Sequence, residues 1–167
     1  MAGVACRGCG ATFETHDGPT HRYMESSPGC WAVYGEVLAR EYSDPAYGSA
    51  HRLTVDAYAV QHPGRPSPQS IQSVALHLMS LCLVLERGVG PDRATAFLQS
   101  AAKDKGRFVW LAPPESRGSV TIKNVHAATN GADHGKLVRA WADSVWTSWA
   151  GHHPKVRAWL GAGQESR

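Results

Sequence analysis

Apolar residues recur at helical spacing along most of the chain, which predicts a mainly helical protein. A serine or aspartate followed by proline, the usual start of a helix, stands at three of the expected starts. The pattern predicts helices over residues 28–42, 45–61, 68–87, 91–103 and 133–152. Pro154 either kinks the last of these helices or opens a final short helix that reaches Leu160. Residues 71–85 are apolar on nearly all sides, so we expect the third helix to be the most buried.

Two segments interrupt this helical pattern. Residues 1–27 are loop-like, and paired prolines break any regular structure over residues 105–119. The segment that follows is either a short strand or a short helix capped by Thr121. We therefore expect a single domain over residues 1–167, with an irregular N-terminal segment joined to a bundle of four to five helices over residues 28–161.

The second predicted helix carries an unusual face. His51, Val55, Tyr58 and His62 share it at the spacing of one helical stripe. Either the histidines are core residues with hydrogen-bond partners, or this face lines a site. We interpret it as a polar seam between the second helix and its neighbours.

The N-terminal segment holds the pair Cys6 and Cys9, separated by two residues and followed by Gly10. This spacing is typical of a zinc knuckle, in which two thiolates and the amides of a turn face one metal ion. Cys30 is the expected third ligand, because it lies in the first turn of the helix that begins at Pro28, where the helix dipole favours a thiolate.

A closed zinc site needs a fourth ligand. We choose His21 over His16, because the loop that carries His21 leads directly to Cys30; His51 or His62 could reach the site as well. Such a Cys3His zinc site would be structural and would tie the N-terminal segment to the first helix. The alternative is a free or redox-active thiol pair, although the βαβ pattern of thioredoxin-like proteins is absent.

The remaining histidines suggest a second, catalytic possibility. His77 lies among leucines on the third helix, and His153 follows the long last helix. If these residues and His62 converge between helices, three imidazoles with an open position would form a catalytic metal site. Asp56 would then orient an imidazole, and Tyr58 would donate a hydrogen bond to a bound oxygen. The fourth cysteine, Cys82, is interpreted as a small buried hydrophobe.

Composition narrows the functional classes. The formal net charge of +3 and the absence of a dense basic stripe make nucleic acid an unlikely partner. The longest apolar run, residues 74–88, is interrupted by His77 and is too short for a membrane span. No signal-peptide pattern opens the chain, so we expect a cytoplasmic protein, in which cysteines favour metal binding over disulfides.

Several blocks of the sequence together resemble a bacterial family of short, functionally uncharacterised proteins. They are CRGCG, THRYMESSPGCWAVYGEVLAREY, HRLTVDAYAVQHPG, SIQSVALHLMSLCLVLERG and WADSVWTSWAGHHPKVRAWL. The resemblance covers most of the chain and brings no assigned activity. The resemblance implies that nine positions are important: Cys6, Cys9, His21, Cys30, Asp56, Gln61, His62, His77 and His153.

The segment WTSWAGHHPKVRAWL is also similar to the histidine-rich last helix of DinB-like, metal-binding four-helix bundles. That likeness implies a metal-dependent hydrolase, transferase or isomerase in which His51 or His62 supplies the earlier histidine. The function that we favour from the sequence is a small zinc-binding protein without chemistry of its own. It would act through a protein or small-molecule partner.

Overall fold

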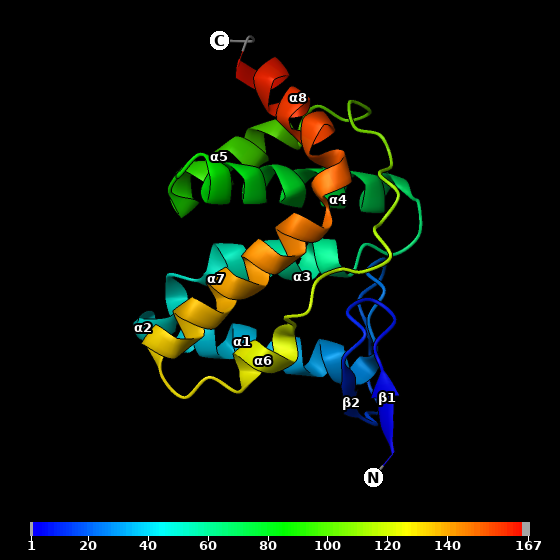
Figure 1. Ribbon diagram of the computed structural model, residues 1–167, viewed down its shortest axis with the longest axis vertical. Helices are drawn as coiled ribbons and strands as arrows, with labels where there is room; N and C mark the ends of the chain where they lie inside the picture. Colours follow the sequence, from blue (N-terminus) through cyan, green and yellow to red (C-terminus); the bar gives the residue numbers. More distant parts are fainter. Residues whose placement is uncertain (1, 165–167) are drawn as a thin grey trace.

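The computed structural model describes residues 2–164 and shows a mainly helical protein, which confirms the predicted class (Figure 1). A short hairpin precedes the helices. Its strands are β1 (Gly3–Ala5) and β2 (Thr12–Glu14). The helical elements are α1 (Pro28–Ser43), α2 (Pro45–Gly48), α3 (His51–Gln61), α4 (Pro68–Leu81), the π-helix η1 (Cys82–Glu86), α5 (Pro91–Ala101), α6 (Ile122–His126), α7 (Gly131–Ser148), the 3-10 helix η2 (Ala150–His152) and α8 (His153–Gln164).

The predicted helix starts are present with their side-chain caps. Ser27 accepts a hydrogen bond from the backbone N–H of Cys30, and Ser67 accepts one from that of Ser70. Asp44 caps α2 in the same way. In the segment that was ambiguous between strand and helix, Thr121 and Asn124 form a capping box, and the result is the short helix α6.

The predicted helix over residues 45–61 is two helices. Gly48 and Ser49 are weak helix formers, and the chain forms a tight turn there. In this turn the N–H of Ala50 donates to the carbonyl of Tyr47, three residues earlier. The turn lets α2 pack against α1 and α7, while α3 enters the centre of the fold. A pattern of apolar residues does not reveal such a change of direction.

The central helix is α3, not the third predicted helix. It packs against α4 on one side and α7 on another, and residues 56–61 are all buried. α4 keeps a half-exposed side that includes Ile71 and Leu76. The face of α3 that carries Tyr58 and His62 therefore lies in the core, and its polar groups must find partners there.

The helices cross one another instead of running side by side as in a simple bundle. In Figure 1, α1, α3 and α4 lie one above another, and α7 crosses them diagonally. The hairpin lies at one edge, next to the N-terminal end of α1. The long connection between α5 and α6 runs down the same edge, held by Gln61, whose Nε2 donates to the carbonyls of Arg117 and Val120.

Within residues 2–164, one helix, Pro68–Glu86 (α4 with η1), is long and apolar enough to cross a membrane by length and composition alone. The sequence-based statement that no run reaches this length is therefore too strong. More than half of this helix is buried against other helices, as in the core helix of an ordinary globular fold. Length and composition here reflect burial within the protein.

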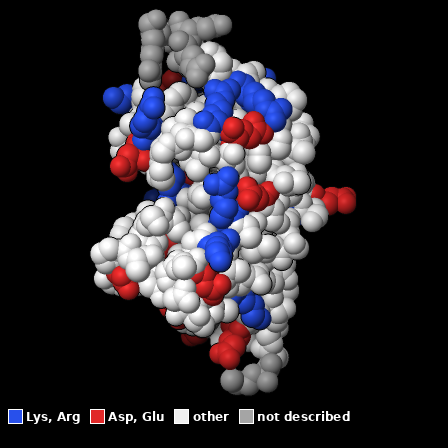
Figure 2. Space-filling model, turned by 60° about the vertical axis from the view of Figure 1, so that its left-hand side comes forward, with Lys and Arg blue, Asp and Glu red and all other residues white. Residues whose placement is uncertain are grey.

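Charged side chains are mixed over the face shown in Figure 2. There, Lys and Arg lie beside Asp and Glu and do not gather into a patch of one sign. Ion pairs between side chains of opposite charge include Arg139 with Asp143 and Arg157 with Glu86. This face offers no basic stripe for a nucleic-acid backbone.

The pH dependence of one contact of α8 follows from its geometry. Arg157 donates two hydrogen bonds to the carboxylate of Glu86 and holds the pKa of Glu86 at about 2, below its ordinary value of 4.5. The stabilisation is therefore fully present above pH 4.5 and is lost as the pH falls towards 2. We expect Glu86→Gln to lower the free energy of unfolding at pH 7 and this loss to shrink below pH 4.5. Urea unfolding of both proteins at several pH values checks this; a loss independent of pH would contradict it.

Candidate metal centre

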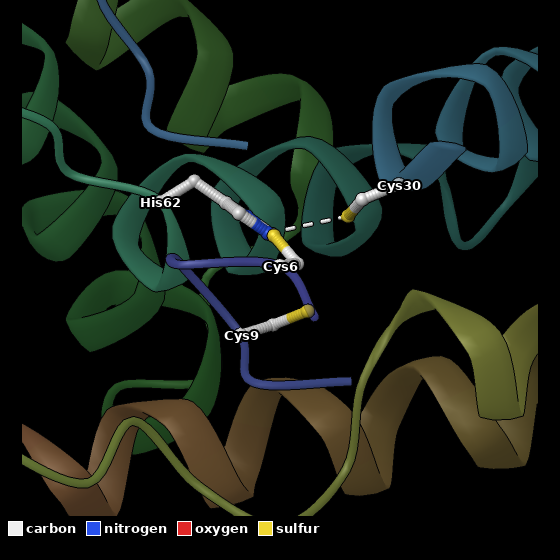
Figure 3. Close-up of side chains that lie close together, drawn as sticks. All are labelled: Cys6, Cys9, Cys30 and His62. Atoms are coloured by element: carbon white, nitrogen blue, oxygen red, sulfur yellow. Dashed lines mark hydrogen bonds between the residues drawn. The ribbon is translucent and has the colours of Figure 1, made fainter. Parts of the chain in front are cut away.

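Three cysteines and one histidine from distant parts of the chain lie together at the edge of the helical core (Figure 3). The sulfur atoms of Cys6, Cys9 and Cys30 and a ring nitrogen of His62 all lie within 4.8 Å of one another. Cys6 and Cys9 come from the turn of the hairpin, Cys30 from the first turn of α1, and His62 from the residue that follows α3. Cys6, Cys30 and His62 are buried, and Cys9 is partly exposed.

The hairpin shapes the turn that presents the first two sulfurs. β1 and β2 pair antiparallel, with Ala5 opposite Thr12. Inside this pair the N–H of Cys6 donates to the carbonyl of Ala11, and the N–H of Gly10 donates to the carbonyl of Cys6. Gly10 has a φ of +78°, a conformation that favours glycine. The local sequence CRGCG thus folds into a tight turn, from which the Cys6 side chain points towards the ring of His62 (Figure 3).

The orientation of His62 is fixed by the backbone of α3. Its Nδ1 lies 2.7 Å from the carbonyl oxygen of Tyr58, which only accepts hydrogen bonds, so Nδ1 carries the proton. The lone pair of Nε2 therefore points towards Cys30 Sγ, 3.4 Å away. Metal-binding histidines commonly donate the N–H of one ring nitrogen to such an acceptor and bind the metal through the other nitrogen. Pro63 ends α3 at this residue and leaves the ring free to turn towards the hairpin.

Tyr58 completes the surroundings of Cys30. Its hydroxyl lies 3.4 Å from Cys30 Sγ, and its ring stacks on that of His62 at a centroid distance of 4.0 Å. Burial and the neighbouring Cys30 thiol raise the pKa of Tyr58, so its hydroxyl keeps its proton, and either this hydroxyl or the Cys30 thiol donates the hydrogen bond between them. The role of Tyr58 as a donor to a bound oxygen stays a prediction.

The distances in the cluster fit a tetrahedral thiophilic cation. A Zn–S bond of about 2.3 Å at tetrahedral angles places sulfur atoms roughly 3.8 Å apart. The observed limit of 4.8 Å needs only a small contraction, and the Cys30–His62 distance of 3.4 Å needs none. Four donors from the protein fill a tetrahedral coordination shell.

The thiols share charge unevenly. Hydrogen bonds from Cys30 and Cys9 hold the pKa of Cys6 below its ordinary value, whereas contacts with Cys6 and Cys9 and burial raise that of Cys30. The thiolate of Cys6 is thus stabilised by hydrogen bonds from the protonated thiols of Cys30 and Cys9. A divalent cation would favour all three thiolates and displace the remaining thiol protons.

His21, the fourth ligand chosen from the sequence, does not belong to the cluster. Its Nδ1 accepts hydrogen bonds from the backbone N–H groups of Tyr23 and Met24, so its ring stabilises the local loop that carries it. His62 occupies the fourth position instead. The sequence offered His62 only as an alternative, because the direction in which α3 ends is a property of the tertiary structure.

Asp56 and His77 lie together, away from the cysteines, at the contact between α3 and α4. The buried carboxylate of Asp56 accepts hydrogen bonds from Arg52, from Nδ1 of His77 at 2.8 Å and from the hydroxyl of Ser80. Asp56 thus pairs with the imidazole of His77, and its predicted role of orienting a metal-bound imidazole stays a prediction. Arg52 and Ser80 were not foreseen.

The three histidines proposed from the sequence as one catalytic site lie in three separate surroundings. His62 faces the cysteines, and His77 faces Asp56. His153 stacks on Trp146 at a centroid distance of 3.7 Å, and its Nε2 donates to the carbonyl of the same residue. Among residues 2–164, the cysteine cluster is the one group of three or more such side chains close enough to hold a metal ion.

A second buried carboxylate was missed by sequence reasoning. Glu41 on α1 accepts hydrogen bonds from His51 Nδ1 and His134 Nε2, each at 2.8 Å, and from the hydroxyl of Thr54. His51 is thus part of a polar contact between helices and not a metal ligand. His134 and Glu41 are 93 positions apart, and no local pattern links them.

Glycine is required at position 8, inside the turn, because atoms of neighbouring residues approach its Cα closely. A Cβ at this position would collide with the ring of His62 and with the backbone oxygen of Glu25. We expect Gly8→Ala to displace the ring and weaken metal binding about 10- to 100-fold, the usual cost of disturbing the support of a metal ligand. Competition with a chromophoric chelator measures this affinity.

Gly35 is the matched control, because it lies in the exposed middle of α1 with open space around a new Cβ. Gly35→Ala should leave metal affinity unchanged and stabilise the protein by roughly 0.5–1 kcal/mol. Equal metal affinities of the two variants would show that the contact between Gly8 and His62 is unimportant.

Comparison with known proteins gives one match. Residues 4–150 match a family described as a family of unknown function (DUF5946), and these residues include the whole cysteine–histidine cluster. No curated protein and no solved structure matches the chain significantly. The expectation of an uncharacterised family is confirmed, and the likeness to DinB-like bundles stays a prediction. Because the match spans most of its length, the chain belongs to the family of unknown function DUF5946.

Proposed function

We propose that the protein binds one structural Zn²⁺ ion through Cys6, Cys9, Cys30 and His62. The observation that carries this proposal is the orientation of the His62 ring. Its Nδ1 is bound to the Tyr58 carbonyl, so its Nε2 lone pair faces the sulfurs. An imidazole held in this way beside three sulfurs is the donor set of a Cys3His zinc site.

The chemistry of the donors selects the metal class. Thiolate sulfur and imidazole nitrogen favour zinc and other thiophilic transition metals, whereas magnesium and calcium prefer oxygen. Reduced thiols in such a site also suit a reducing compartment, and we propose the bacterial cytoplasm as its location.

A structural role suits the coordination better than a catalytic one. Four protein donors leave no position for a water or substrate, and three of the four residues are buried. The ion would join the hairpin to the beginning of α1 and the end of α3. It would thereby contribute directly to folding free energy. The resulting scaffold would act through a protein or small-molecule partner. The alternative of a three-histidine enzyme has no comparable support, because those histidines are separated.

Elemental analysis of the full-length protein, produced under reducing conditions with zinc, tests this proposal. We expect one zinc per chain, lost in Cys6→Ser or Cys9→Ser. Cys82→Ala is the matched control, since Cys82 is a buried cysteine on η1 outside the cluster, and this variant should retain its zinc. A protein that is metal-free, and equally stable with and without a strong chelator, would overturn the proposal.

A further inference from the structure

We propose that a pocket beside the metal centre binds a small molecule through an oxyanion, a phosphate or carboxylate group. The pocket has a volume of about 310 Å³ and opens between two facing segments, residues 22–25 and 64–67, with Ser70 of α4 also in its wall. This volume lies at the small end of the range for ligand sites, roughly 300–1,000 Å³, so the ligand is small.

Positive charge dominates the wall of the pocket. Arg22 and Arg65 both line it, and neither guanidinium has a hydrogen bond or ion pair within residues 2–164. Glu25 supplies a negative charge in the same wall, which leaves a net charge of +1. Guanidinium groups bind carboxylate and phosphate through paired hydrogen bonds, so two free ones at one pocket favour an oxyanion.

The serines of the pocket hold an unused donor. The hydroxyls of Ser67 and Ser70 lie 3.0 Å apart and share one hydrogen bond, while Ser67 Oγ also accepts from the N–H of Ser70. Two hydroxyl protons are present and one bond between them is made, so the second proton has no acceptor in the protein. Because Ser67 donates the bond between the two hydroxyls, the remaining proton belongs to Ser70, which lines the pocket and is 1% exposed. An oxyanion in the pocket would accept it.

The start of α4 adds to this attraction. Ser67 is the N-cap of this helix of 14 residues and lines the pocket, so the positive end of the helix dipole faces the ligand. Tyr23, Met24 and Pro66 provide apolar surface in the same wall. The expected ligand is thus a small organic phosphate or acid with a short apolar part.

The walls of the pocket are attached to His62. The backbone N–H of Glu25 donates to the carbonyl of His62 at 3.3 Å. Gly64, with a φ of +73°, lies so close to the carbonyl of Tyr23 that a Cβ there would collide with it. Metal bound by His62 would hold both walls in place and strengthen anion binding. This coupling, unlike the pocket itself, rests on the proposed zinc site.

Titration of the zinc-loaded, full-length protein with inorganic phosphate, and separately with acetate, tests the proposal at constant ionic strength. We expect saturable shifts of the backbone amide signals of Gly64 and Ser67 in NMR spectra. Arg22→Ala and Arg65→Ala should each weaken binding about tenfold or more, the cost of losing a charge-assisted hydrogen bond. Arg93→Ala removes an exposed charge on α5 and should have no effect.

The relative affinities of the two anions identify the ligand class, phosphate or carboxylate. Absence of saturation by either anion, or equal weakening by Arg65→Ala and Arg93→Ala, would overturn the proposal. Phosphate binding that depends on Arg65 but is the same after chelator treatment would support the pocket and contradict its coupling to metal. Because Arg22 and Arg65 are exposed, both variants should fold normally, which far-ultraviolet circular dichroism verifies.

Discussion

His62→Ala is expected to lower the zinc affinity of the protein about a hundredfold or more. The substitution removes one of four donors and the side-chain hydrogen bond to the buried carbonyl of Tyr58, which keeps the hydrogen bond from the backbone N–H of position 62. At a fixed free zinc concentration above the dissociation constant of both proteins, a hundredfold weaker affinity lowers the free energy of unfolding by about 2.7 kcal/mol. Chelator competition measures the affinity, and urea unfolding in a zinc buffer measures the stability.

His21→Ala provides the decisive control. His21 was the fourth ligand expected from the sequence, but its Nδ1 accepts hydrogen bonds from Tyr23 and Met24. Its replacement should cost about 1 kcal/mol of loop stabilisation and leave zinc affinity unchanged. A fall in zinc affinity with His21→Ala, and none with His62→Ala, would restore the sequence-based choice and remove the structural one.

Features with a local cause could be predicted from the sequence. The starts of α1 and α4 follow from a serine before a proline, because the cap and the fixed proline angle act within one turn. The spacing of Cys6 and Cys9 predicts a turn with two inward thiols, and Cys30 was found through its place in the first turn of α1. These inferences need no knowledge of how distant segments pack.

Features set by packing between distant segments could not be predicted. His62 faces the cysteines because α3 runs through the core and ends beside the hairpin, which apolar spacing does not encode. The turn of the hairpin is also held by Arg117, more than 100 positions away, which donates to the carbonyl of Gly8. The order in which the helices pack decides both contacts.

The buried carboxylate of Asp56 shows the same division between features with a local cause and features set by packing. A polar face on α3 was recognised, and Asp56 was expected to orient an imidazole. Which imidazole it meets depends on the register of α3 against α4, and that register places His77 and Ser80 on the same carboxylate. Charged residues at helical spacing indicate a polar contact, but they do not identify the partner residues on the neighbouring helix.

Asp56→Ala is expected to lower the free energy of unfolding by about 3–5 kcal/mol, the usual cost of breaking a buried ion pair. The side chain of Asp56 is fully buried, and Arg52, His77 and Ser80 all donate to it. Without the carboxylate, the Arg52 guanidinium, which is 16% exposed, would keep its charge at the contact between α3 and α4 without a counter-ion. Urea unfolding checks the loss, and zinc content should stay at one per chain because Asp56 lies outside the cluster.

Asp143→Ala separates this effect from the general loss of an aspartate. Asp143 pairs with Arg139 one helical turn away on α7, and both side chains are more than half exposed. Solvent weakens such a pair, so its loss should change the free energy of unfolding by only about 0.5 kcal/mol. Similar losses in the two variants would mean that burial gives the Asp56 network no special weight. A large loss confined to Asp56→Ala, with zinc retained, would make Asp56, Arg52 and His77 a structural network that joins α3 to α4.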